Sequence, residues 1–272
     1  MPKDLRTSLA FAQSWNDLPK GSVYTSDQFE DWLHPIKKED ISGKTILELG
    51  CGNGSLLTHM AKWLPSYLEG VDLGDSVKSA RENMALTDFE SWEVIQADLI
   101  SYGRKQFDFV YSIGVLHHLK DPEEGFRAVE RATKPGGRFH CWVYGYEGNF
   151  FIRAFVDPLR KIVFRLPWFA IKHLIAFPLT IPFFLASQLT KLFENEIFKK
   201  IFPMYSYLKW ISRYSFRFHH HVACDQILSP QTTYIKKQTI EKWLDEANVE
   251  NTYIIQRNGN SWKFGGDINI SN

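Results

Sequence analysis

The stretch KTILELGCGNG, residues 44–54, joins an apolar run to a cluster of three glycines. Its first six residues have the composition of a buried strand, whereas SLLTHMAKW at 55–63 carries apolar residues at helical spacing. Gly50, Gly52 and Gly54 therefore lie in a turn between a strand and a helix. A glycine turn at this position lets a ligand approach the backbone and the helix N-terminus, so the stretch predicts a ligand site.

The alternation of strands and helices continues downstream of this turn. Strands that alternate with helices at this pitch predict a doubly wound α/β fold with a seven-stranded, mostly parallel sheet. The pattern is lost for about ninety residues after residue 145, so we expect a helical insertion before the last helix and strands. The expected strands are 44–49, 67–73, 92–96, 107–113, 138–144, 252–256 and 262–264.

We accordingly expect three parts in the chain. Residues 1–41 form an N-terminal helical lid segment, residues 42–145 and 236–272 form the sheet domain, and residues 146–235 form a basic, aromatic-rich helical cap. Between residues 151 and 218 stand eleven lysines and arginines against three acids, a net charge of +8, and 17 of the 41 aromatic residues. The rest of the chain therefore carries −7, and the cap differs from it in chemistry.

The overall composition excludes several classes of protein. Of the 272 residues, 44% are hydrophobic and 23% charged, which excludes a disordered chain. The net charge of +1 shows no global imbalance that would point to nucleic acid. Three cysteines without a CxxC pair fit a reducing compartment, and the first residues lack the apolar run of a signal peptide, so we expect a cytoplasmic protein.

Three acidic residues are expected at the same edge of the sheet as the glycine turn. A carboxylate at Glu48 would repel a pyrophosphate and attract a ligand that carries an ammonium and a sulfonium group. Asp72, at the end of the second strand, could accept hydrogen bonds from the two hydroxyls of a ribose. Asp98, after the third strand, could accept one from an adenine amino group. Each aspartate also suits a helix N-cap, and Glu48 could be a polar residue without a ligand.

Five segments share one pattern: ILELGCGNG at 46–54, GVD at 70–72, QAD at 96–98, FDFVYSIGVLHHLKDP at 107–122 and KPGG at 134–137. Together they resemble the cofactor half of the class I S-adenosylmethionine-dependent methyltransferases, in the branch that contains small-molecule, quinone and sterol methylases. The resemblance covers about residues 42–145, with weaker similarity at 237–265. It implies a Rossmann-like fold and S-adenosylmethionine as the cofactor, and it says little about the methyl acceptor.

The resemblance also implies roles for particular residues. Glu48 would hold the amino group of the cofactor, Asp72 its ribose and Asp98 its adenine, with Leu73 against the adenine ring. Trp15 and Tyr24 are candidates for a lid over the cofactor, although both could simply pack onto the sheet. The remaining residues of the expected cofactor site are Gly50, Cys51, Gly52 and Gly54 in the loop beneath the methionine part, Leu99, and Ser112 and Ile113 facing the methionine part.

Methyl transfer from a sulfonium is an in-line displacement, which requires alignment of the reacting atoms and exclusion of water. A base is needed only when the acceptor begins protonated, as a phenol or an alcohol does. His117 and His118 follow the fourth strand, where such an acceptor would arrive, and His117 is the predicted base. The alternative is that one of the two histidines merely caps the loop.

A second group of histidines, His219, His220 and His221, lies near Cys224 and raises the question of a metal. On a strand, consecutive side chains point to opposite faces, and no second pair of Cys or His is in sight. We therefore expect no metal, and assign these histidines to the acceptor pocket or to packing beneath the cap.

The stretch LIAFPLTIPFFLASQL, residues 174–189, is uncharged. At 16 residues with two prolines it is expected to be too short and too broken to span a membrane, which needs about 20 apolar residues. An apolar core with cationic, aromatic flanks is typical of a segment that lies on an anionic membrane. The alternative is a helical cap whose apolar residues form its own core.

Three functions are compatible with the sequence. The first is methyl transfer to a small hydrophobic or lipid-linked acceptor, with the cap as lid and peripheral membrane contact. The second is methyl transfer to RNA or a nucleotide-linked sugar, whose phosphates would meet the +8 charge. The third is a non-catalytic module that binds the cofactor. The intact loop and carboxylates disfavour the third, and long apolar runs are poor surfaces for phosphates, so the first is preferred and nucleic acid is not the expected partner.

Overall fold

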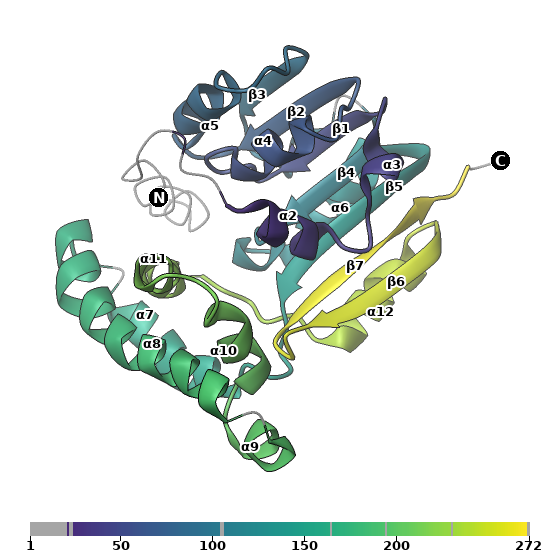
Figure 1. Cartoon of the computed structure of the whole chain (residues 1–272). Coiled ribbons are helices and arrows are strands. Elements are labelled where there is room, and N and C mark those ends of the chain that lie inside the picture. Colours follow the sequence, from purple (N-terminus) through teal and green to yellow (C-terminus); the bar gives the residue numbers. More distant parts are fainter. Residues whose placement is uncertain are drawn as a thin grey trace.

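The structure is a computed structural model, and it describes residues 21, 24–103, 106–163, 165–193, 195–229 and 231–270. Seven strands form one sheet in the order β3-β2-β1-β4-β5-β7-β6. All neighbours from β3 to β5 pair in parallel, whereas β7 runs antiparallel to both β5 and β6. The predicted doubly wound α/β fold with seven strands is therefore confirmed (Figure 1). The strands are β1 (Thr45–Leu49), β2 (Tyr67–Asp72), β3 (Trp92–Gln96), β4 (Phe107–Ile113), β5 (Thr133–Tyr144), β6 (Val249–Arg257) and β7 (Ser261–Ile268).

Helices cover both faces of the sheet because the buried strands alternate apolar side chains between two cores. In β4, Val110 points into one core, and Phe109 and Tyr111 point into the other. The first core is closed by α6 (Pro122–Ala132) and α12 (Lys237–Glu246). The second is closed by α2 (Ser26–Leu33), α3 (Lys38–Ile41), α4 (Ser55–Ala61) and α5 (Val77–Met84).

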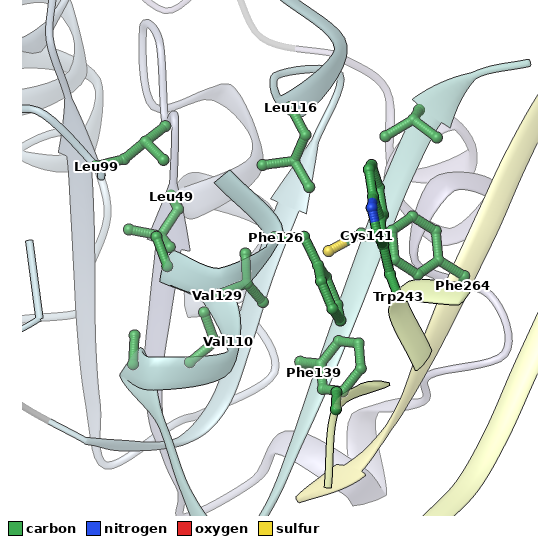
Figure 2. Close-up of a cluster of buried hydrophobic side chains, with 14 of the residues drawn as sticks. Leu49, Leu99, Val110, Leu116, Phe126, Val129, Phe139, Cys141, Trp243 and Phe264 are labelled. Atoms are coloured by element: carbon green, nitrogen blue, oxygen red, sulfur yellow. The ribbon is translucent and has the colours of Figure 1, made fainter. Parts of the chain in front are cut away.

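Aromatic rings hold the first core together across elements that are distant in sequence. Phe126 of α6 stacks on Trp243 of α12, with ring centroids 5.6 Å apart, and meets Phe139 of β5 edge-on at the same centroid distance. Phe264 of β7 completes the group, so the last helix and strands are fixed against the middle of the sheet (Figure 2). This packing places the end of the chain beside β5 despite the long insertion between them.

The insertion forms a separate layer of helices next to the sheet (Figure 1). It has a small core of its own, in which Val163, Ile171 and Cys224 are buried. It returns to the sheet through main-chain hydrogen bonds, from Ile235 N to Tyr144 O at 2.9 Å and from Thr233 N to His117 O at 2.7 Å. Its helices are η2 (Ile152–Val156), α7 (Asp157–Val163), η3 (Ala170–Ala176), α8 (Phe177–Leu192), α9 (Glu196–Ile201), α10 (Tyr205–Ile211) and α11 (Phe216–Leu228).

Two expectations about the insertion were wrong. The three histidines at 219–221 lie in α11 and not on a strand, because Ser215 caps a helix there by accepting from Phe218 N. The apolar stretch is also not broken by its prolines: η3 and α8 form one continuous helix of 23 residues, Ala170–Leu192. Pro178 follows the wider π-type turns of η3 directly, and Pro182 lies inside α8, so neither proline ends the helix.

By length and composition this helix could cross a membrane, contrary to the expectation from the sequence. Its most apolar window has a mean hydropathy of 1.5, and only 22% of that window is buried inside the protein. Length and hydropathy alone do not distinguish a helix that spans a membrane from one that lies on a membrane surface. The contacts that α8 makes with the rest of the insertion distinguish the two.

Candidate active site

A cavity of about 560 Å³ lies where the carboxyl ends of β1, β2, β4 and β5 face the insertion. The strand order reverses between β1 and β4, and open α/β sheets bind ligands at such a point. One side of the cavity is made by the glycine turn and the polar residues of the sheet. The other side is made by α8, α10 and α11 together with β6, so the cavity joins two chemically different walls.

The glycine turn is held tightly against its neighbours. Gly50 has a φ of 86°, and a Cβ added there would come within 2.3 Å of Val115 Cγ2. The N–H groups of Gly50 and Cys51 both donate to Val71 O, at 2.7 and 3.0 Å, which fixes the turn to β2. Gly54 precedes the first turn of α4 in the left-handed conformation. The turn thus leaves open backbone at the helix N-terminus, as its sequence predicts.

Glu48 is a buried carboxyl group on the cavity wall. Tyr111 donates a hydrogen bond to Glu48 Oε2 at 2.9 Å, and the described residues include no ion-pair partner for Glu48. Burial raises the pKa of Glu48 to about 8, against the opposing effect of the Tyr111 hydrogen bond. A buried acid without a cation beside it suits a ligand that brings an ammonium group.

Asp72, at the end of β2, is oriented by three donors. Gly52 N donates to its Oδ2 at 2.9 Å, while Gly74 N and the Ser76 hydroxyl donate to its Oδ1 at 2.8 and 3.2 Å. Burial raises the pKa of Asp72, and these hydrogen bonds oppose that rise by stabilising the carboxylate. Oδ2 keeps one lone pair, whereas both lone pairs of Oδ1 are used, so the carboxylate can receive one ribose hydroxyl directly and a second in place of the Ser76 hydroxyl.

Asp98 lies away from the cavity. Its Oδ1 accepts from Ile100 N at 2.9 Å, so the side chain caps the turn after β3 and remains exposed to solvent. The neighbouring Leu99 lines the cavity, as does Leu73. The structure therefore offers apolar side chains for a flat adenine ring, and it gives Asp98 the capping role that was the alternative interpretation.

His117 also lies behind the cavity wall, and this placement argues against the predicted role as base. It is fully buried, and its Nδ1 accepts from Tyr144 N at 3.3 Å, so the ring proton is on Nε2. Burial holds the pKa of His117 well below its ordinary value of 6.5. A base needs an available lone pair facing the substrate, and the Nδ1 lone pair of His117 is occupied by the main chain.

His118 does line the cavity, one residue further along the helical turn η1 (Leu116–His118). Its Nδ1 lies 3.0 Å from Gln231 O and from the Ser229 hydroxyl, and 3.2 Å from the Thr232 hydroxyl. The carbonyl can only accept, and Ser229 gives its own proton to Gln231 O at 2.6 Å, so we assign the ring proton to Nδ1. The basic nitrogen is therefore Nε2. Burial lowers the pKa of His118 to about 4, which keeps the ring neutral at physiological pH.

The wall contributed by the insertion is mostly apolar and aromatic, with a few polar groups among the rings. Tyr144 is oriented by Gln226, whose Nε2 donates to the Tyr144 hydroxyl at 2.9 Å. Gln226 is held in turn by Arg160, which is buried and donates to Gln226 Oε1 at 2.7 Å and to Asp157 Oδ1 at 2.7 Å. The positive charge of Arg160 is therefore paired inside the insertion and does not contribute to its exposed surface.

Arg257 brings a second buried cation to the same wall. Its Nε donates to Asp31 Oδ2 at 2.8 Å, and its guanidinium lies 4.5 Å from the ring centroid of Trp210. Arg257 ends β6, whose direction matches that of β5, so it arrives at the same sheet edge as Glu48. The sequence did not reveal it because the expected strand 252–256 ended one residue before Arg257.

Tyr24 closes the cofactor side of the cavity. Its backbone N–H donates to Ser55 Oγ at 2.6 Å at the start of α4, and its ring lies 6.5 Å from that of His221 in the insertion. This position agrees with a lid, whereas the second lid candidate, Trp15, lies outside the described residues.

The structure brings most of the predicted cofactor residues together around one cavity. Those that line it are Glu48, Gly50, Cys51, Gly52, Asp72, Leu73, Leu99 and Ile113. Gly54, Asp98, Ser112 and His117 do not line it, and Ser112 instead ties β4 to β1 by donating to Leu49 O at 2.8 Å. Lining residues that the sequence reasoning did not include are Ser76, Val115, Trp142, Tyr144 and Arg257.

The histidines of α11 do not gather into a metal site. His219 Nε2 lies 2.8 Å from the Ser187 hydroxyl, and His221 Nε2 lies 3.2 Å from Asp225 Oδ2. Within the described ranges there is no group of three or more His, Cys, Asp or Glu side chains that could hold a metal ion.

The fold and this sheet edge define the class of the protein, that of the S-adenosylmethionine-dependent methyltransferases with a Rossmann-like sheet. The family model of the methyltransferase domain matches residues 23–200, and the chain belongs to this family. S-adenosylmethionine is accordingly its cofactor, and the open glycine turn, the buried acid at Glu48 and the oriented carboxylate of Asp72 fit that molecule.

Comparisons with known proteins agree on the family and differ in the acceptor. A tRNA U34 carboxymethyltransferase of Desulfotalea psychrophila is 29% identical over 157 residues, covering 54% of this chain and 48% of that protein. A ubiquinone biosynthesis O-methyltransferase of Pseudomonas syringae is 30% identical over 111 residues, covering 40% of this chain and 47% of that protein. The chain therefore spans about half the length of these curated relatives.

A solved structure extends the likeness to nearly the whole chain. The magnesium protoporphyrin IX methyltransferase of Synechocystis PCC 6803, with bound SAH, superposes with a TM-score of 0.50 at 14% identity. The match covers 97% of this chain and 85% of that one. At this identity the likeness concerns the fold alone.

Proposed function

We propose that the protein transfers the methyl group of S-adenosylmethionine to a small, largely apolar acceptor whose nucleophile must lose a proton, such as a phenol or an alcohol. The observation that carries this proposal is the cavity itself. Its sheet side presents Glu48 and Asp72 for the cofactor, and its insertion side presents aromatic and aliphatic side chains for an acceptor. The two sites share one enclosed space, which in-line transfer requires.

Different side chains bind different parts of the cofactor. Glu48 accepts from the ammonium group and Asp72 from the ribose hydroxyls, which positions the cofactor along the ends of β1 and β2. Bound S-adenosylmethionine supplies the methyl group as an activated sulfonium. Tyr24 and the aromatic wall exclude water, so that the acceptor and not water is the nucleophile.

His118 is the residue that we assign to the proton. Its Nδ1–H is held by Gln231 O, which leaves Nε2 to accept a proton from the acceptor hydroxyl. The low pKa keeps His118 unprotonated at physiological pH, and a proton accepted by Nε2 during the transfer passes on to water after product release.

The acceptor can be found without knowing its name. Purified protein with S-adenosylmethionine is incubated with extracted metabolites and lipids, and products that gain 14 mass units are sought by mass spectrometry. We expect a product of low polarity, formed in smaller amount by Asp72→Ala when the cofactor is not saturating. Transfer to water-soluble, strongly charged compounds alone would contradict the proposal.

Methylation of RNA is the second candidate, and two observations favour it: the +8 charge of residues 151–218 and the likeness to a tRNA U34 carboxymethyltransferase. The exposed surface of the insertion weighs against it, because large apolar side chains interrupt the basic residues. Transfer of labelled methyl groups to total tRNA, with none to the lipid extract, would make this the better account.

A further inference from the structure

Helix α8 buries several small polar side chains and exposes large apolar ones, which is unusual for a helix of a soluble protein. Thr180, Ser187 and Thr190 face the rest of the insertion and are fully buried. Their hydroxyls donate to carbonyls of the same helix, at 2.7, 2.8 and 2.6 Å, so burying them leaves no donor unsatisfied. The side of α8 that packs on the protein therefore combines these small polar residues with the half-buried rings of Phe183 and Phe184, which meet His219 of α11.

The opposite side of α8 is built from large apolar residues that face outward. They follow one another at intervals of four and three residues, which places them in one stripe. We call this stripe the apolar face; it consists of Phe177, Ile181, Leu185, Leu189 and Leu192, which are 41–73% exposed. Large apolar side chains are seldom exposed in a continuous stripe on a soluble protein, so this face is suited to an apolar partner.

The segments before and after α8 continue the pattern and add positive charge. Ile162, Phe169 and Leu174 are each more than two-thirds exposed on the preceding helices. Exposed basic residues flank α8 on both sides: Lys161, Arg165, Lys191, Lys199 and Lys200. Of the described acids between residues 151 and 218, Asp157 pairs with the buried Arg160 and Glu196 with Lys199. The surroundings of the apolar face are therefore strongly basic.

We propose that the apolar face docks on the surface of an anionic lipid bilayer, with α8 lying in the plane of the interface. An exposed apolar stripe with a basic rim enters the acyl boundary while its lysines and arginines meet anionic headgroups. The charge also argues against a second copy of the chain as the occupant, because a two-fold contact would bring two basic rims together.

Packing of α8 argues for docking and against a membrane span. The buried side of α8 contacts α10 and α11 along its length. Polar contacts bind it there: Lys209 Nζ donates to Thr190 O at 3.4 Å, and Gln188 Nε2 donates to Ser212 O at 3.3 Å. A spanning helix would have to leave these partners and expose its buried hydroxyl groups to lipid.

The cavity opens on the same insertion that carries the apolar face. Phe155 and Leu179 line the cavity and are 68% and 43% exposed, and helical spacing puts Leu179 on the side of α8 away from the apolar face. Docking would therefore hold the opening near the bilayer, where an apolar acceptor is concentrated. This last step rests on the proposed function, whereas the docking itself does not.

Flotation of the full-length protein with vesicles tests the docking directly. We expect the protein to float with vesicles of phosphatidylcholine and phosphatidylglycerol at low salt, and not with phosphatidylcholine alone. Ile181→Glu with Leu185→Glu should abolish flotation, and Lys161→Glu with Arg165→Glu should weaken it at least tenfold. The matched control is Leu64→Glu with Leu86→Glu, two leucines that are 59% and 70% exposed on the sheet domain and should not matter.

Several outcomes would overturn the proposal. The first is that the wild type does not float at low salt, where the electrostatic attraction is strongest. The second is that the apolar-face variant floats as well as the wild type. The third is that the bound protein resists extraction by alkaline carbonate, which would indicate a membrane span. A dimer that becomes a monomer in the apolar-face variant, without vesicle binding, would assign the face to a second copy. Titration of S-adenosylhomocysteine into each variant checks that the fold is kept. If the wild type itself does not bind S-adenosylhomocysteine, the proposed function is contradicted, whereas the docking proposal is not affected.

Discussion

At the scale of single residues, the environment of each group decides its role more than its identity does. His117 and His118 are adjacent in sequence and have the same side chain, yet the hydrogen bond from Tyr144 N makes Nδ1 of His117 an acceptor. The contact with Gln231 O makes Nδ1 of His118 a donor. The sequence could place a histidine pair after the fourth strand, but it could not show which of the two faces the cavity, because Gln231 is more than a hundred residues away.

The same holds for the acids. Glu48 and Asp72 lie on the cavity as predicted, because each belongs to a strand whose end is fixed by the parallel sheet. Asp98 follows the strand end by two residues and turns outward to cap the next turn. A carboxylate that ends a strand is therefore placed by the sheet, and one in the following loop is not.

The raised pKa of Glu48 predicts how cofactor binding depends on pH. The ammonium group of the cofactor needs an ionised carboxylate, whereas in the free protein the Glu48 carboxyl group, with a pKa of about 8, is mostly protonated below that pH. Affinity for S-adenosylhomocysteine should therefore rise roughly fiftyfold between about pH 6 and about pH 8, with release of a proton on binding at the lower pH. Calorimetry in buffers of different ionisation enthalpy measures both quantities.

Glu48→Gln is the control, since it should bind more weakly at high pH and show no proton release. Because the folded state binds the extra proton, the contribution of Glu48 to the free energy of unfolding also falls as pH rises from about 4.5 to about 8. Affinity that is flat over this range in the wild type would contradict the assignment of Glu48.

Substitution of the two histidines separates the base from its neighbour. With an acceptor in hand, His118→Ala should lower turnover roughly a hundredfold or more while leaving affinity for S-adenosylhomocysteine nearly unchanged. His117→Ala should lower the free energy of unfolding, because it leaves a void behind the cavity wall, with a much smaller effect on turnover per folded molecule. The reverse pattern would return the role of base to His117.

At the scale of elements, the sheet and the presence of a helical insertion followed from the sequence, whereas the course of the helices inside the insertion did not. The expected strands 92–96 and 107–113 coincide with β3 and β4, because short apolar runs bounded by turns have few alternative structures. Helix α11 was missed because its histidines and aromatics lack a clear apolar period, and Ser215 before it was the signal that could have revealed it. The 23-residue helix was underestimated because its two prolines were taken as breaks.

The insertion should depend on Arg160 for its internal stability. Arg160 is buried in α7 and joins it to Gln226 of α11 and to the Tyr234 hydroxyl, at 3.0 Å. Removing one partner from such a buried network costs roughly 3 kcal/mol, so Arg160→Ala should unfold the insertion at lower urea concentration. Hydrogen exchange should quicken between residues 149 and 235 before it does so in the sheet.

Lys161→Ala provides the comparison, because Lys161 is exposed on the same helix and its loss should change the free energy of unfolding by less than ~0.5 kcal/mol. Equal effects of the two substitutions would show that the buried network does not hold the insertion together.

At the scale of the whole molecule, two surfaces of opposite chemistry meet at one cavity. The acidic sheet domain supplies the polar cofactor wall, and the basic insertion supplies an apolar wall and an outward apolar face. This division explains why a net charge of +1 conceals a segment of +8. A cytoplasmic location with peripheral membrane contact, as expected from the sequence, stays a prediction that flotation of the docking variants tests.

The central claim is that the glycine turn, Glu48 and Asp72 form the site for S-adenosylmethionine. Calorimetric titration of S-adenosylhomocysteine into the wild type and into Asp72→Ala tests it most directly. We predict micromolar affinity for the wild type and a loss of more than ~1.4 kcal/mol, a tenfold weakening, in the variant, because two ribose hydrogen bonds to a charged acceptor disappear. Binding of NAD in its place, or equal affinity of the two proteins, would contradict the account.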